Sequence, residues 1–454
     1  MSEHRSEERT RSAAKTGDER LREEQSARSE HRSLGIAAAT SEPTPETVEA
    51  LVGMVSVEEI QAAAELLQGV IRYTPMESSR PLNLMVGGPV YLKCENLQRT
   101  GSFKIRGAYT RIARLTDEER AHGVVAASAG NHAQGVALAA ALLHCDATVF
   151  MPVGASIAKL TATRAYGATV HLHGETLDEA LIEARAFAAR TGAVLVHPFD
   201  HPDILRGQGT VGLEILEQVP DVATIVVSAG GGGLISGIAA AVRPGRPDVR
   251  IIGVQAEQAA AWPNSLAAGK PVRLMQMSTL ADGIAVGEPT ELTYSHVSGL
   301  VDDIVTVSED QLSRAMLLCL ERAKLVVEPA GAAAIAAIMA APEKFVPPVV
   351  AVLSGGNIDP LVLLHVTQHG LVAAGRFLSL RIEISDRPGS LAKLLAQVGA
   401  LGASVVDVEQ SRLGNTLALG DVEVDLRLEC RGPEHRDELL ESLAAQQVRV
   451  LDYR

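Results

Sequence analysis

Four short segments of the sequence combine residue types that could do chemistry. The first is a tetraglycine of Gly230, Gly231, Gly232 and Gly233, which follows the apolar run 225–227 and precedes a helical pattern from Leu234. Glycines let backbone N–H groups close on an anion, and the start of a helix adds partial positive charge. No Lys-Ser or Lys-Thr follows, so the segment is not a nucleotide P-loop. In this position it predicts a phosphate cradle rather than a flexible turn.

The second segment is Ser102-Phe103-Lys104, which follows the strand-like run 90–93 and leads into a helix. A lysine that attacks a carbonyl carbon must lose its proton near neutral pH, and desolvation or a nearby positive dipole achieves this. Taken alone, the pattern leaves open the ordinary alternative, a solvated surface charge.

The third and fourth segments each follow an apolar run. The third consists of Ser128, Ala129, Gly130, Asn131 and His132 and opens a helix. N–H groups at a helix start, with Ser and Asn side chains, suit a carboxylate and a phenolic oxygen, although a simple helix cap is the alternative. For His132 a structural role is favoured over proton transfer. The fourth segment begins at Ser354, whose hydroxyl could meet a ring nitrogen or could merely end the strand.

Short apolar runs alternate with amphipathic helical stretches between about residues 55 and 365. The runs are 124–127, 148–151, 170–172, 194–196, 225–227, 251–254 and 349–353. This alternation predicts parallel strands with crossover helices on both faces of the sheet. Ligands in such sheets bind at the carboxyl ends of strands, where the chemical segments lie.

The pattern changes from about residue 376, where apolar and polar residues alternate over 378–385 as in a half-buried strand. A turn at 386–389, a helical repeat at 391–398, strand-like runs at 403–410 and 416–429, a helix near 434–445 and a last short strand follow. The order β-α-β-β-α-β is that of the ferredoxin-like fold.

Composition limits the class of protein. The 454 residues carry a net charge of −14, which argues against nucleic acid as a partner. No apolar run is long enough to span a membrane, and no secretory signal is recognised, so a cytoplasmic location is expected. The four cysteines form no CxxC pair and are expected to be reduced. Residues 1–45, rich in Arg, Glu and Ser, are expected to form a disordered charged tail.

Together the four segments resemble the fold-type II pyridoxal-phosphate enzymes, specifically the threonine and serine dehydratases. The stretches that carry the resemblance are, in order, 95–108, 128–135, 207–210, 230–233, 328–332 and 354–357. The resemblance implies a tryptophan-synthase-β-like α/β fold of two parallel-sheet subdomains over 46–370, with a small subdomain inserted at about 90–195. The unit at 376–454 resembles an ACT domain, the ferredoxin-like unit that binds regulatory amino acids in many dehydratases.

The resemblance also implies a role for each site residue. Lys104 would hold pyridoxal 5′-phosphate covalently and act as the catalytic base, with Phe103 packed on the pyridine ring. The other cofactor contacts would be Asn131 at the ring 3′-oxygen, Gly230, Gly231, Gly232 and Gly233 at the phosphate, and Ser354 at the pyridine nitrogen. The substrate carboxylate would meet Ser102, Ser128, Ala129, Gly130, Asn131 and His132. Glu328 would lie near the cofactor, and an effector would bind near Asp386, Pro388, Gly389, Ser390 and Leu391.

The implied activity is that of a carbon–nitrogen lyase, a threonine ammonia-lyase. It would convert L-threonine to 2-oxobutanoate and ammonia, and L-serine to pyruvate as a secondary activity. The ACT domain implies allosteric feedback by an amino acid, as in isoleucine biosynthesis, although breakdown of threonine uses the same chemistry. A homo-oligomer, dimer or tetramer, is the family's usual state.

Two alternatives stay open. One is a serine racemase or serine dehydratase of the same fold. Racemases carry a second serine where this chain has Ala129, and they ligate Mg²⁺ with acids where it has Gln255 and Ala261. No divalent metal site is therefore expected, while a monovalent cation held by carbonyls remains open. The other alternative is a non-catalytic amino-acid sensor, which the intact Lys104 and tetraglycine disfavour.

Overall fold

The computed structural model describes residues 53–412, 417–446 and 448–453. The charged tail predicted at 1–45 lies outside these described residues. None of the helices in the described ranges is both long and apolar enough to cross a bilayer.

A six-stranded sheet has the order β1-β2-β10-β7-β8-β9. Its strands are β1 (Met76–Ser78), β2 (Val90–Lys93), β7 (Thr224–Ser228), β8 (Arg250–Ala256), β9 (Asp303–Val307) and β10 (Val349–Val352). All neighbours from β2 to β9 pair in parallel, as predicted, but β1 pairs antiparallel with β2. Residues 79–89 join β1 to β2, and this link is too short for the crossover that a parallel pair requires.

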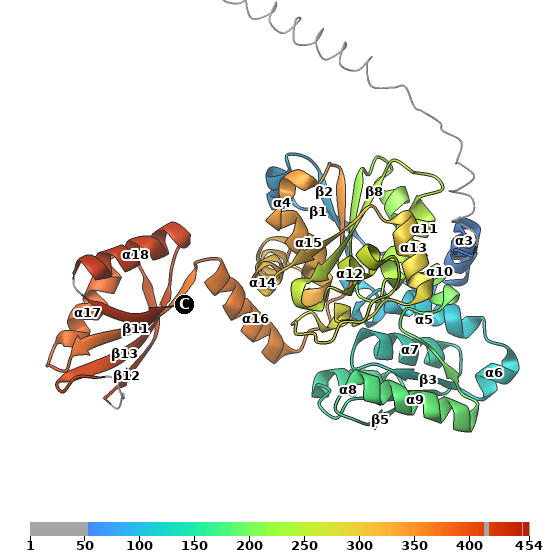
Figure 1. The fold of residues 1–454 in the computed structure, drawn as a ribbon, viewed down its shortest axis with the longest axis horizontal. Coiled ribbons are helices and arrows are strands. Elements are labelled where there is room, and N and C mark those ends of the chain that lie inside the picture. Colours follow the sequence, from blue (N-terminus) through green and yellow to red (C-terminus); the bar gives the residue numbers. More distant parts are fainter. Residues whose placement is uncertain (1–52, 413–416, 447, 454) are drawn as a thin grey trace, which may run out of the picture. The chain divides into compact units, whose positions relative to one another are not determined.

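Helices cover both faces of this sheet (Figure 1). Alternate side chains of the buried strands therefore enter two different cores. Val226 and Ala351 pack with helix α15 (Pro329–Ala340), whereas Ile225 and Val350 pack with helix α11 (Gly233–Val242). The remaining helices of this part are α3 (Val57–Leu66), α4 (Arg80–Val86), α10 (Pro202–Gln218), α12 (Ala261–Ala268), α13 (Glu291–Leu300), α14 (Glu309–Leu318) and α16 (Pro360–Ala373).

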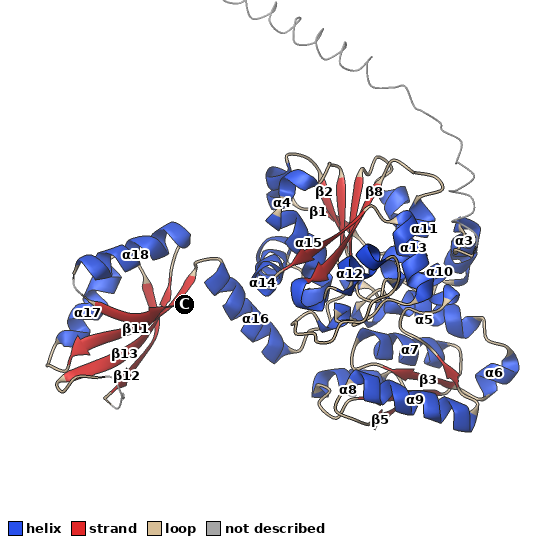
Figure 2. Ribbon diagram, in the orientation of Figure 1, coloured by secondary structure: helices blue, strands red, loops and turns tan. Residues whose placement is uncertain are grey.

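A second, four-stranded parallel sheet has the order β5-β4-β3-β6. Its strands are β3 (Val124–Ala127), β4 (Ala147–Met151), β5 (Thr169–Leu172) and β6 (Val194–Leu195), and its helices are α5 (Lys104–Ala113), α6 (Asp117–Ala121), α7 (Asn131–Leu142), α8 (Ile157–Ala165) and α9 (Leu177–Thr191). Helices α7 and α9 lie on opposite faces of the sheet (Figure 2). Strand β2, inside the span 90–195 predicted for the small subdomain, pairs in the large sheet.

The C-terminal unit has the predicted order β-α-β-β-α-β. Its elements are β11 (Phe377–Ser385), α17 (Ser390–Ala400), β12 (Ser404–Ser411), β13 (Asp421–Glu429), α18 (Pro433–Ala445) and β14 (Arg449–Tyr453), with the antiparallel sheet order β12-β13-β11-β14. Leu380 and Leu426 on one sheet face pack against Leu394 of α17 and Leu439 of α18. The predicted ferredoxin-like fold is confirmed.

Candidate active site

A cavity of about 370 Å³ lies where several parallel strands end. Ser128 follows β3, Ser228 ends β7 and Ser354 lies just beyond β10. The cavity is lined by segments predicted separately from the sequence, namely Phe103, Lys104, Ser128, Ala129, Gly130, Asn131, His132, Gly230, Gly231, Gly232, Gly233, Glu328 and Ser354. The fold therefore joins, in one place, residues that are more than 200 positions apart.

Lys104 begins helix α5 and extends its amine into the cavity. The Nζ atom donates a hydrogen bond to the carbonyl oxygen of Pro198 at 3.0 Å and lies 5.0 Å from the centre of the Phe103 ring. Burial lowers the pKa of Lys104 to about 8, although the nearby Glu328 acts in the opposite direction. A neutral, nucleophilic amine is therefore far more accessible at Lys104 than at an exposed lysine.

The tetraglycine connects β7 to the start of α11. The Nε1 atom of Trp262 donates to the carbonyl oxygen of Gly230 at 2.7 Å, and Gly232 has a φ of 92°. A side chain on Gly231 would overlap the ring of Phe199. Only glycine fits this packed turn, so its N–H groups and those of the helix start can face an anion in the cavity.

Asn131 and Glu328 are hydrogen-bonded across the cavity wall. The Nδ2 atom of Asn131 donates to Oε1 of Glu328 at 2.5 Å, although these residues are 197 positions apart in the chain. Burial, with a further contribution from Asp282, raises the pKa of Glu328 to about 7. Near neutral pH this carboxyl group is thus able to exist in either protonation state.

Ser354 is buried at the cavity wall beside Ser228. The Oγ atom of Ser228 donates to Oγ of Ser354 at 3.0 Å. This contact leaves the proton of the Ser354 hydroxyl free for an acceptor in the cavity.

His132 and Ser102 differ in their surroundings from the other predicted residues. His132 lines the cavity, but burial lowers its pKa to about 3, and its Nε2 atom lies 2.7 Å from the carbonyl oxygen of Val196. It is therefore a neutral ring that joins α7 to the end of β6. Ser102 is fully buried outside the lining, and its Oγ atom has no hydrogen-bond partner among the described residues.

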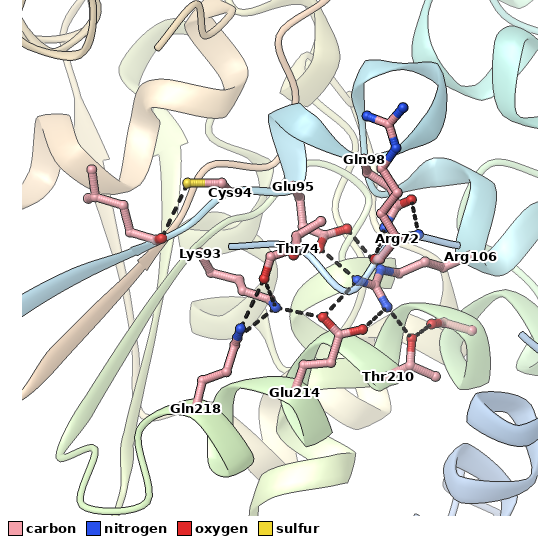
Figure 3. A network of polar contacts seen from close by, with 12 residues as sticks. Arg72, Thr74, Lys93, Cys94, Glu95, Gln98, Arg106, Thr210, Glu214 and Gln218 are labelled. Atoms are coloured by element: carbon pink, nitrogen blue, oxygen red, sulfur yellow. Dashed lines mark hydrogen bonds and ion pairs between the residues drawn. The ribbon is translucent and has the colours of Figure 1, made fainter. Parts of the chain in front are cut away.

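A buried ionic network supports helix α5 (Figure 3). The Arg106 guanidinium donates to both carboxylate oxygens of Glu95 at 2.8 Å, to both of Glu214 at 2.7 and 3.0 Å, and to the Thr210 hydroxyl at 3.0 Å. Lys93 donates to Glu214 at 2.6 Å. Two cations face two carboxylates, so the network ties α5 to α10 and to the end of β2 without net charge.

Several cavity residues were not predicted. Pro198 and Phe199 lie in the segment before α10, and no local motif marks them. Lys159 and Asp282 also line the cavity and form an ion pair at 2.6 Å. The Asp282 side chain is exposed. No local pattern in the sequence distinguishes it from other acidic residues at the surface.

The predicted effector segment runs from the end of β11 into the first turn of α17, which begins at Ser390. Asp386 forms an exposed ion pair with Arg412, at 2.7 and 3.0 Å. Gly389 has a φ of 90° and precedes α17.

The four cysteines are buried and unpaired in the described chain. Within the same residues, no group of His, Cys, Asp and Glu could hold a metal ion.

Comparison with known proteins gives two family matches. Residues 67–355 match the model of the pyridoxal-phosphate dependent enzymes, and residues 385–425 match an ACT domain. An L-threonine ammonia-lyase of Thermotoga maritima is 45% identical over 400 residues, which is 88% of this chain and 100% of that protein. An L-threonine ammonia-lyase of Geobacter sulfurreducens is 46% identical over 385 residues, 85% of this chain and 96% of that protein.

Solved structures are also similar. A processed threonine deaminase from Solanum lycopersicum has a TM-score of 0.67 and 37% identity, and the match covers 73% of this chain and 90% of that one. A maize serine racemase has a TM-score of 0.66 and 36% identity, and the match covers 68% of this chain and 96% of that one.

Proposed function

The chain belongs to the pyridoxal-phosphate-dependent enzymes and ends in an ACT domain, and on that premise we propose that it is an L-threonine ammonia-lyase. It would convert L-threonine to 2-oxobutanoate and ammonia, and L-serine to pyruvate as a secondary activity. The observation that carries this assignment is the 45% identity to a threonine ammonia-lyase over 88% of the chain.

The cavity fits pyridoxal phosphate on three independent grounds. Its volume of about 370 Å³ is in the range of small-molecule sites. The packed glycine turn at the start of the ten-residue helix α11 offers N–H donors to a phosphate. The Lys104 amine, with a pKa of about 8, is suited to attack the cofactor's aldehyde.

We assign the contacts to the cofactor accordingly. Lys104 would hold the cofactor covalently, Gly230 to Gly233 would bind its phosphate, Asn131 its 3′-oxygen and Ser354 its ring nitrogen, with Phe103 against the ring. When bound, pyridoxal phosphate supplies an electron-withdrawing ring that makes the Cα proton of an amino acid acidic. Because a hydroxyl such as that of Ser354 does not keep the ring nitrogen protonated, this environment favours prompt elimination.

The chain's own residues would then perform two tasks. The released Lys104 amine would take the Cα proton, since its lowered pKa leaves it partly neutral near pH 7. The helix start at Ser128 to Asn131 would orient the substrate carboxylate through backbone N–H groups. The Pro198 carbonyl, which accepts from the Lys104 amine, offers the released lysine a fixed place.

Serine racemization is a second candidate, because a maize serine racemase is 36% identical over 68% of the chain. A racemase delivers a proton to the opposite face of the substrate. Ala129 lines the cavity at the position where racemases of this fold carry a serine, and its methyl group cannot donate a proton. Racemization is therefore the less favoured activity.

The ACT domain implies that an amino acid regulates the enzyme. We propose that this amino acid binds near Asp386 to Leu391. We also propose that the protein acts as a dimer or tetramer and that the protein works in the cytoplasm. Buried, unpaired cysteines fit a reducing compartment. Deletion from Gly375 onward is expected to abolish the response to isoleucine or valine, and an unchanged response would contradict the assignment.

The test is an assay of purified protein with L-threonine, L-serine and D-serine, in the wild type and in Lys104→Ala. The exposed Lys270→Ala is the matched control. We expect 2-oxobutanoate to form fastest, from L-threonine, in the wild type and the control but not in Lys104→Ala. Formation of D-serine from L-serine with little keto acid would instead identify a racemase.

A further inference from the structure

The loop 354–357 after β10 contacts two residues of the cavity lining and a turn outside the lining. The backbone of Gly355 accepts from Glu328 N at 3.1 Å, and a side chain on Gly355 would contact both Glu328 and Asn131. The Nδ2 atom of Asn357 donates to the Thr100 carbonyl at 2.6 Å and to Oδ1 of Asn131 at 2.8 Å. Asn357 itself is absent from the cavity lining.

The chemistry of these contacts fixes the orientation of two amide groups. A backbone carbonyl can only accept, so the Asn357 atom that meets Thr100 must be the nitrogen. That same nitrogen meets Asn131, so the facing atom of Asn131 must be its oxygen. The nitrogen of Asn131 is thereby directed to Glu328, where the 2.5 Å contact places it.

We infer that Asn357 is a positioning residue, which keeps the nitrogen of Asn131 available as the donor to the cofactor's 3′-oxygen. The inference rests on the proposed function, because Asn131 has this task only if pyridoxal phosphate binds here. Asn131 has two N–H donors, and Glu328 uses one. The other is free for the cofactor. If the amide were reversed, the oxygen of Asn131 would face the cofactor's 3′-oxygen, and neither atom could donate.

The same side chain also holds the segment that leads to Lys104. Thr100 has a φ of 62°, a left-handed conformation that costs free energy for a branched residue. Gly356 N donates to the Gly101 carbonyl at 2.9 Å, and Ser102 pairs with Gly355 as an isolated bridge. Asn357 therefore links the strained turn before Lys104 with the start of α7, which carries Asn131.

The experiment compares Asn357→Asp with Asn96→Asp. Both changes replace a buried or half-buried amide by a carboxylate of the same shape. The Asn96 side chain lies beside the same loop and, among the described residues, donates only to the Val326 carbonyl, at 3.1 Å and away from Asn131. We expect Asn357→Asp to weaken the affinity of the PLP-free protein for pyridoxal phosphate about ten- to a hundredfold and to shift the absorbance of the bound cofactor. Asn96→Asp is expected to do neither.

A double variant separates orientation from folding. In Asn357→Asp with Glu328→Gln, the net charge is that of the wild type. A reversed Asn131 amide can then donate to the new carboxylate at position 357 and accept from the new amide at position 328. We expect thermal stability to recover in part relative to Asn357→Asp, because the Thr100 carbonyl still lacks its donor, while cofactor affinity stays low.

Equal cofactor affinities of Asn357→Asp and Asn96→Asp would overturn the inference, as would recovery of affinity together with stability in the double variant. Because these measurements use cofactor binding, they are independent of the substrate. A wild type that binds pyridoxal phosphate but releases no 2-oxobutanoate from L-threonine would refute the proposed function alone.

Discussion

Replacement of Arg106 by methionine tests the buried network most severely. The arginine is fully buried, and each of its five N–H donors has an acceptor. Its loss leaves the carboxylates of Glu95 and Glu214 opposite the single cation of Lys93, and of these three side chains only Glu214, 11% exposed, reaches solvent. Methionine fills a similar volume, so the main change is electrostatic.

The expected loss of unfolding free energy is about 3–5 kcal/mol, the cost of breaking a buried ion pair by removing one partner. The matched control is Arg273→Met. Arg273 pairs with Asp178 at 2.9 Å, but these side chains are 67% and 72% exposed. Such a pair contributes about 0–1 kcal/mol, although its length lies within the 2.7–3.0 Å range of the contacts between Arg106 and the two carboxylates. The difference between the variants therefore isolates burial.

Urea unfolding, followed by fluorescence, measures both variants. The chain contains one tryptophan, Trp262, which is fully buried beside the tetraglycine, so its emission reports on this part of the fold. All proteins are compared at saturating cofactor and equal concentration, because ligand and oligomer both shift apparent stability. If Arg106→Met and Arg273→Met agreed within about 1 kcal/mol, the network would be screened by water and the reasoning refuted.

Three further predictions follow from the geometry. Gly231→Ala should weaken pyridoxal phosphate binding about tenfold or more, because its methyl group overlaps an aromatic ring, whereas Gly245→Ala, with open space around it, should not; equilibrium dialysis measures both. In PLP-free protein, the rate of cofactor attachment should rise with pH and level off near the Lys104 pKa of about 8, and a rise continuing to about pH 10 would indicate an ordinary lysine. Although burial opposes it, hydrogen bonds from Arg206 and another arginine lower the pKa of Asp203. The stability they provide is present above the usual carboxyl pKa of about 3.9 and is lost as pH falls through the lower folded value, so acid unfolding curves should be flatter in Asp203→Asn.

Much of the fold could be predicted, because buried parallel strands are continuous apolar runs. The run Val349–Leu353 and strand β10 agree to within one residue. Strand β1 was missed because Met76–Ser78 is short, half exposed and without alternation. Strand β9, Asp303–Val307, was also missed, since its partly exposed edge position allows polar residues among the apolar ones.

The site was predictable only where a local segment carries its own chemistry. Lys104 and the tetraglycine have informative neighbours in the sequence. The hydrogen bond from Asn357 to Asn131 spans 226 positions, and the one from Lys104 to Pro198 spans 94. Such contacts depend on how the two parallel sheets and their loops pack, which no short pattern encodes.

The most direct test of the account is to find which lysine carries the cofactor. Borohydride reduction of the purified protein fixes the cofactor to its lysine, and mass spectrometry of the digested chain then locates it. The account predicts modification of Lys104 alone, and none in Lys104→Ala. Modification of Lys159, which also lines the cavity, or of no lysine, would contradict it.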